Sequence, residues 1–224
     1  MKLRLSPLTV VATLFAAGCS DNNSGAPTSP QSGSAISFFV SSAKSTTGNL
    51  GGLAGADNLC QSLATTVGAG NKLWQAYLSV ERDRDNKPTD ARSRIGTGPW
   101  VNANGIVVAQ DLNQLHSRTG DAAVFVDERG QRIPGQWAGS PPPVEHDILT
   151  GSNADGTLMP GFTCSDWTSE SATLAAQVGH TDGMGPNGST AGALSSWNSS
   201  HTSQNCANTA PRGGAGRIYC FARN

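Results

Sequence analysis

The chain lacks the features that mark several common classes of protein. Charged residues make up only 14% of it, aromatic residues 6%, and the hydrophobic fraction of 37% is also low. The basic residues are scattered, and the one denser stretch, at 82–94, has acidic residues between them. A nucleic-acid-binding protein needs a basic face to release counterions from phosphates, so we expect no nucleic-acid partner.

Motifs of the familiar hydrolases and zinc sites are missing as well. The sequence contains no Gly-x-Ser-x-Gly turn, no His-Glu-x-x-His and no Cys-x-x-Cys. These patterns place a serine nucleophile, two zinc-binding imidazoles or a pair of zinc-binding thiolates. We therefore expect no enzyme activity and assign no catalytic residue, with a metal-dependent hydrolase kept as a remote alternative.

The N-terminal apolar run, at 8–15, is too short to span a membrane. It follows Lys2 and Arg4 and precedes Ala-Ala-Gly and then Cys19, which is the layout of a secretory signal. Its end resembles the lipobox of bacterial lipoproteins. The resemblance implies removal of residues 1–18, acylation of Cys19 and, because Ser20 follows, a lipid-anchored position at the bacterial outer membrane or cell surface. The alternative is a plain signal peptide in which Cys19 is incidental.

The rest of the chain divides into a tether and one domain. Residues 19–34 contain almost nothing that can be buried, which predicts a flexible tether after Cys19. Residues 35–224 have the size of a single domain. The 27 glycines and 12 prolines of the chain predict long loops around a modest core.

Four cysteines remain for this domain, namely Cys60, Cys164, Cys206 and Cys220. An oxidising compartment favours disulfides between them, and the sequence alone allows three pairings. Hydrophobic periodicity predicts a helix at 52–65 with Cys60 on its buried face. Strands are predicted at 36–40, 72–80, 106–108, 123–126 and 218–221. Few regular elements are expected between 134 and 216, where long loops are typical of a functional site.

A series of motifs runs through residues 36–222. They are GNLGGLAGADNLC (48–60), WQAYLS (74–79), RIGTGPWVN (94–102), HDILTGS (146–152), TCSDWTS (163–169), SWNSSH (196–201) and GAGRIYCF (214–221). In this order they resemble the C-type-lectin-like domains, and more closely the endostatin-like branch and bacterial lectin-like lipoproteins of the DUF1554 type. The resemblance implies an α+β C-type-lectin-like fold with small antiparallel sheets, one or two helices, long loops and the disulfides Cys60–Cys220 and Cys164–Cys206.

Sugar-binding members of that superfamily hold calcium through two loop motifs. The corresponding positions here are Gly-Pro-Asn at 185–187 and Trp-Asn-Ser at 197–199, and each lacks one acidic or amide ligand. Calcium takes six to eight oxygen ligands, so Asp182, Asn187 and Asn198 are too few without help from the backbone. We expect no cofactor, with calcium on these three residues as the alternative.

Three of the four histidines lie in the long-loop region, each with a polar group close by in the sequence. Imidazole and carboxylate are ligands for zinc and similar metals. If the loops converge, these groups form one polar site, and His146, His180 and His201 then lie close together. The alternative is that each makes only local hydrogen bonds in its own loop. The candidate ligand-binding residues are His146, Asp147, His180, Asp182, Asn187, Asn198 and His201.

These observations favour a membrane-anchored, extracytoplasmic binding module. We expect it to recognise a glycan, or an envelope or host protein, through the loops between 134 and 216. The alternative function is that of a structural or accessory envelope lipoprotein that binds a protein partner and no small ligand.

Overall fold

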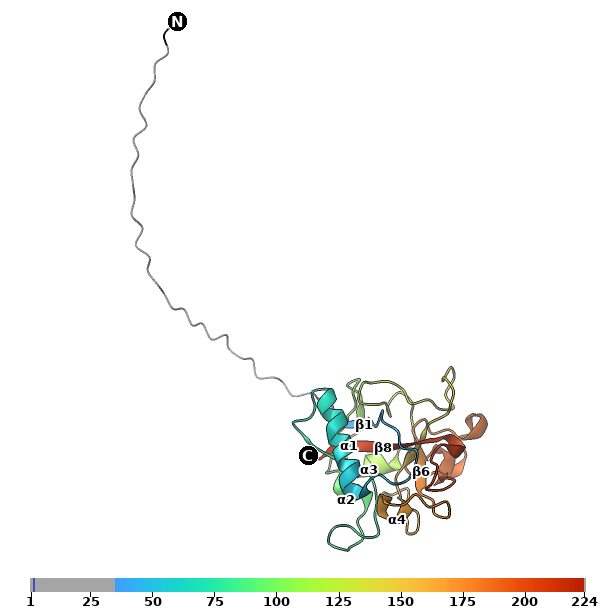
Figure 1. Ribbon diagram of the computed structural model, residues 1–224. Helices are drawn as coiled ribbons and strands as arrows, with labels where there is room; N and C mark the ends of the chain where they lie inside the picture. Colours follow the sequence, from blue (N-terminus) through green and yellow to red (C-terminus); the bar gives the residue numbers. More distant parts are fainter. Residues whose placement is uncertain (1, 3–34, 224) are drawn as a thin grey trace. The chain divides into compact units, whose positions relative to one another are not determined.

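The computed structural model describes Lys2 and residues 35–223 (Figure 1). Cys19, the predicted tether and all of the predicted signal segment except Lys2 lie outside the described residues. Residues 35–223 belong to one compact unit. None of the helices in the described part of the chain is both long enough and apolar enough to cross a membrane.

The main sheet is built around its last strand, β8 (Gly214–Arg223), in the order β1-β8-β5-β6-β7. β1 (Phe38–Val40) and β2 (Leu73–Ala76) both pair antiparallel with the C-terminal part of β8. β5 (Asp147–Leu149) runs parallel to the beginning of β8. β6 (Gln177–His180) and β7 (His201–Thr202) continue the sheet antiparallel. β5, β6 and β7, which are far apart in the sequence, are therefore neighbours in the part of the sheet next to the beginning of β8.

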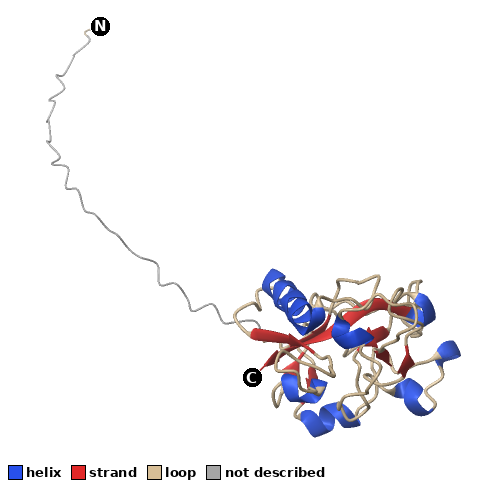
Figure 2. Cartoon of the chain, turned by 60° about the horizontal axis from the view of Figure 1, so that its bottom comes forward, coloured by secondary structure: helices blue, strands red, loops and turns tan. Residues whose placement is uncertain are grey.

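Side chains alternate between the two faces of the sheet along each strand, and both faces are buried. In β8, Ile218, Cys220 and Ala222 belong to one hydrophobic cluster, whereas Tyr219 and Phe221 belong to the other. The first cluster contains the buried side of α1 (Gly52–Thr66), which packs against the sheet (Figures 1 and 2). The second cluster is rich in aromatic rings.

The remaining elements are short (Figure 2). A separate hairpin pairs β3 with β4. The bounds are Trp100–Val101 for β3, Val107–Ala109 for β4, Ala91–Arg94 for α2, Leu112–Ser117 for α3 and Cys164–Trp167 for α4. Three 3-10 turns follow, with the bounds Pro186–Gly188, Gly192–Ser195 and Pro211–Gly213.

Both expected disulfides are present, in a mixed α+β fold with small sheets and few helices. Cys60, on the buried side of α1, pairs with Cys220 in β8 across 160 residues of sequence. Cys164 pairs with Cys206 across 42 residues. The first bridge therefore joins the first helix to the last strand, and the second closes the long-loop region.

The predicted strand at 123–126 is wrong. Residues 122–124 form a turn, because the Asp121 carbonyl accepts hydrogen bonds from the backbone N–H groups of Val124 and Phe125, both at 2.9 Å. The side chain of Asp121 also accepts from the N–H of Ala123. The apolar residues here are buried as a turn, with Phe125 stacked on Trp197 at a centroid distance of 5.4 Å. A buried turn needs apolar residues just as a buried strand does, so the apolar run at 123–126 resembled a strand in the sequence.

Candidate metal centre

The strand register brings three polar side chains to one face of the sheet. Asp147 lies directly opposite His180 in the antiparallel pair of β5 and β6, and His201 in β7 lies opposite Val178. Val178 and His180 are two residues apart in β6, so their side chains share a face. Paired residues of adjacent strands also point to the same side. Asp147, His180 and His201 therefore project together, and His146 joins them from the residue before β5.

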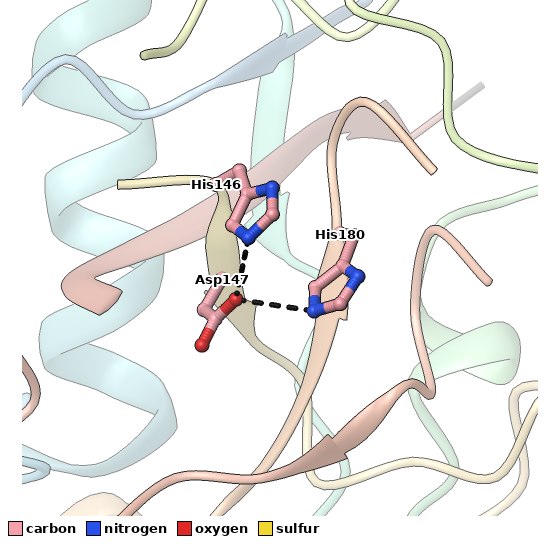
Figure 3. A group of neighbouring side chains, drawn as sticks. All are labelled: His146, Asp147 and His180. Carbon is pink, nitrogen blue, oxygen red and sulfur yellow. Dashed lines mark ion pairs between the residues drawn. The ribbon is translucent and has the colours of Figure 1, made fainter. Parts of the chain in front are cut away.

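The carboxylate of Asp147 is the centre of this cluster. Its side chain is 2% exposed, yet neither of its oxygens accepts a hydrogen bond from any described residue. Three imidazole nitrogens surround it instead: Oδ1 lies 3.3 Å from the Nε2 atoms of both His146 and His180 (Figure 3), and Oδ2 lies 3.6 Å from Nε2 of His201. A buried carboxylate without partners is costly, so the arrangement calls for a positive charge.

The opposite nitrogen of each imidazole is held by a hydrogen-bond acceptor. Nδ1 donates to the Asp182 carboxylate in His146 (2.8 Å), to the carbonyl of Leu194 in His180 (2.9 Å) and to the carbonyl of Thr202 in His201 (3.0 Å). A carbonyl or carboxylate oxygen only accepts, so Nδ1 carries the proton in all three rings. In the neutral imidazole, Nε2 then has a free lone pair.

Two of these lone pairs face each other directly. Nε2 of His180 lies 2.9 Å from Nε2 of His201. Two nitrogen acceptors at this separation repel each other unless a proton or a metal cation lies between them. The ring of His146 stacks on that of His180 with a centroid distance of 4.3 Å, which directs its Nε2 to the same carboxylate (Figure 3).

The pKa values of His180 and Asp182 are shifted by the charged and polar groups next to them. Burial alone lowers the pKa of His180, but the adjacent Asp147 carboxylate outweighs that effect and the pKa is raised above its usual 6.5. Burial also tends to raise the pKa of Asp182. Contact with His146 and the backbone N–H groups of Gln136 and Met184 outweigh it, so the pKa of Asp182 is lowered. Asp182 therefore stays ionised and keeps the Nδ1 proton on His146.

The two distances from Asp147 to its neighbouring histidines suit a metal ion. His146, Asp147 and His180 each offer one ligand atom, and these atoms lie within 4.8 Å of one another. A tetrahedral zinc ion with bonds of about 2.0–2.1 Å keeps its ligand atoms about 3.3 Å apart, close to the separations around Asp147. His201 faces the other carboxylate oxygen, and its side chain is 30% exposed.

A cavity of about 480 Å³ opens over the cluster. Its lining residues are Gln136, Val144, His146, His180, Pro186, Leu194, His201, Arg212 and Gly213. All of them fall between 134 and 216, the region in which the sequence placed a binding site. The size is typical of a site for a small ligand.

The other predicted site residues have different places. Asp182 contacts the cluster only through His146. Asn198 is buried, and its amide donates to Tyr77 Oη and to the carbonyls of Asn153 and Ala154, away from the histidines. Asn187 is exposed in the turn Pro186–Gly188. The side-chain oxygens of Asp182 and Asn198 already accept hydrogen bonds from other groups of the protein. This arrangement therefore gives no support to calcium on Asp182, Asn187 and Asn198.

Sequence reasoning missed the residues that orient and enclose the cluster. Leu194 and Thr202 act through backbone carbonyls, which no side-chain pattern reveals. Gly213 has φ of 102°, and a Cβ atom there would lie 3.2 Å from Nε2 of His146. Arg212 carried no motif, although its neighbourhood of Pro and Gly does predict a turn.

No curated protein sequence matches the chain significantly. Residues 43–184, which include His146, Asp147, His180 and Asp182 but not His201, match a family described as "Protein of unknown function (DUF1554)". The match covers more than half of the chain, and the protein therefore belongs to the DUF1554 family.

Proposed function

We propose that the protein is an extracytoplasmic binding module that holds a zinc-like transition-metal ion between His146, Asp147 and His180, with His201 as the fourth ligand. The ion forms the floor of the cavity, where a ligand reaches it. One observation carries the proposal: Asp147 is buried without a hydrogen-bond partner, and three Nε2 lone pairs face it.

The ligand types favour zinc or a similar ion over calcium. Calcium prefers six to eight oxygens, whereas three imidazoles and one carboxylate suit zinc and its neighbours in the first transition row. The hydrogen bond from His146 to Asp182 is the outer-shell contact that fixes a metal-binding imidazole, and backbone carbonyls do the same for His180 and His201.

The same cavity supports binding more than catalysis. Hydrolysis by a metal-bound water usually relies on a nearby carboxylate as general base. Of the described residues that line the cavity, none carries a carboxylate. Asp147, which lies behind the lining residues His146 and His180, is a proposed metal ligand. We therefore assign no catalytic residue.

The wider assignment is also a proposal. It comprises a C-type-lectin-like fold, a lipid anchor on Cys19 at the outer membrane or cell surface, and a glycan or an envelope or host protein as the natural partner. The two disulfides support an oxidising compartment. A cavity formed within 134–216 supports recognition by these loops. The alternative is an accessory lipoprotein with only a protein partner. That function does not account for a metal site in an open cavity.

Metal content tests the proposal. Protein purified under oxidising conditions is dialysed against zinc and then against buffer, and bound metal is measured by elemental analysis. We expect about one zinc per chain in the wild type and in His116→Gln, which alters the histidine outside the cluster. His180→Ala and Asp147→Ala should lose it. Absence of zinc from the wild type, or retention in both alanine variants, would refute the metal site.

A further inference from the structure

Arg212 is placed at the mouth of the metal cavity by the turn Pro211–Gly213. It lines the cavity together with the three histidines. Its Nη1 donates to the carbonyl of Thr202 at 3.2 Å, and the same carbonyl accepts from Nδ1 of His201 at 3.0 Å. One backbone oxygen thus holds both the guanidinium and a proposed metal ligand.

The guanidinium of Arg212 has no carboxylate partner in the described part of the chain. Among residues 35–223, no carboxylate lies within ion-pair distance of Arg212. Its guanidinium has five N–H donors in a planar fork, and the contact with Thr202 uses only part of them. The remaining donors suit a planar anion that arrives through the cavity mouth.

A divalent ion bound at the histidine cluster does not compensate the charge of Arg212. Asp147 and Asp182 together balance the charge of the ion, which leaves Arg212 in excess. The walls between floor and mouth include the apolar side chains of Val144, Pro186 and Leu194. Such walls suit a hydrocarbon body better than they suit a phosphate dianion, which has no apolar part.

We propose that the cavity binds a carboxylate with a small apolar body, which places one oxygen on the metal ion, pairs with Arg212 and lays its apolar part against Val144, Pro186 and Leu194. This inference rests on the proposed metal site. It narrows the ligand of the module to anionic, partly apolar compounds, including the acidic ends of larger molecules.

Cobalt-loaded protein provides the test, because the visible spectrum of cobalt reports on its ligands. Benzoate is titrated into the holoprotein, with benzamide as its neutral counterpart and inorganic phosphate as a different anion. We expect benzoate to change the spectrum and to bind more tightly than the other two. Arg212→Gln should weaken benzoate binding roughly 3- to 10-fold and leave the metal content unchanged. Arg212→Lys should recover part of this loss.

The matched control is Arg84→Gln, since the side chain of Arg84 is 94% exposed and does not line the cavity. It should bind benzoate like the wild type. Equal binding of benzoate and benzamide, tighter binding of phosphate, or no effect of Arg212→Gln would overturn the carboxylate site while the metal site stands. A chain that takes up no metal fails at the earlier step and overturns both proposals.

Discussion

Asp147 and His180 stand directly opposite each other in the antiparallel pair of β5 and β6, with Oδ1 of the first 3.3 Å from Nε2 of the second. Their meeting depends on strand register, because a slip of one residue would place them on opposite faces of the sheet. The register is fixed in turn by Leu149 and Val178, a pair that is buried in the core on the α1 side. Core packing therefore aligns the proposed metal ligands.

The first prediction concerns Asp147→Asn, which keeps the shape of the side chain and removes its charge. Zinc at one hundred times its Kd should stabilise the wild type by about 2.7 kcal/mol. For a domain of this size that free energy raises Tm by about 5–10 °C. Asp147→Asn should lose this shift, because the ion loses its only charged ligand. Thermal unfolding with zinc and with a chelator measures it.

Asp155→Asn is the matched control, since Asp155 is an exposed carboxylate in a turn, held by Thr157. Its zinc-dependent shift should equal that of the wild type. A zinc shift of normal size in Asp147→Asn would mean that the ion, if bound, lies elsewhere.

Asp182 is predicted to act on the metal through His146. Asp182→Asn should weaken zinc binding about 10- to 100-fold, because a neutral amide holds the Nδ1 proton of His146 less strongly than a carboxylate does. Competition with a chelating dye measures the affinity. Loss of an outer-shell contact lowers affinity without abolishing binding, so one equivalent of zinc should still bind at saturation. Unchanged affinity would show that the Asp182–His146 contact serves the loop alone.

The sequence predicted some parts of this fold well, for physical reasons. The helix at 52–65 and the last strand have regular apolar spacing, so their periodicity was visible. β5 and β6 were missed because they have only three and four residues, and each contributes a polar site residue, Asp147 or His180. Such short segments carry no periodic signal.

The candidate site was predictable by residue type and not by geometry. His146, His180 and His201 were singled out as metal-ligating types, but only tertiary structure shows that they meet. The carbonyls of Leu194 and Thr202 orient two of the rings, and every residue has a carbonyl. The sequence therefore gives no signal for these contacts. Asn198 shows the opposite error. Its residue type suggested a ligand, but its amide instead donates hydrogen bonds to the backbone at 153–154.

The two disulfides are predicted to contribute differently to stability. In the chain-entropy relation, the 42-residue loop of Cys164–Cys206 is worth about 4 kcal/mol and the 160-residue loop of Cys60–Cys220 about 5 kcal/mol. Urea unfolding of the two paired Cys→Ser variants, without reductant, measures these losses. Losses below about 1 kcal/mol in both variants would contradict the prediction.

Removal of Cys164–Cys206 should also have a local effect. All four residues of α4 have φ between 49° and 65°, a left-handed turn that costs non-glycine residues about 1–2 kcal/mol each. The disulfide and the buried Trp167 hold this turn. Without the bridge, proteolytic cleavage should begin near 164–167, whereas removal of Cys60–Cys220 should not direct cleavage to that turn.

The last prediction concerns pH and His116, which lies outside the metal cluster. Burial lowers the pKa of this histidine below its usual 6.5. Its Nδ1 donates to the carbonyl of Leu112 at 2.7 Å, so its Nε2 accepts from the hydroxyl of Tyr77 at 2.9 Å. Burial also raises the pKa of Tyr77, which therefore remains a neutral donor. Protonated His116 would have no lone pair for this hydroxyl.

Because the pKa of His116 is lower in the folded than in the unfolded protein, the folded state is favoured above pH 6.5. Its stability should fall as the pH drops from 6.5 towards the folded-state pKa. His116→Gln removes this titration, so the difference in unfolding free energy between wild type and variant should shrink over that range. Urea unfolding from pH 7.5 to pH 5, with a chelator present to exclude metal effects, measures the difference. A constant difference over the whole range would show that His116 does not titrate differently in the two states.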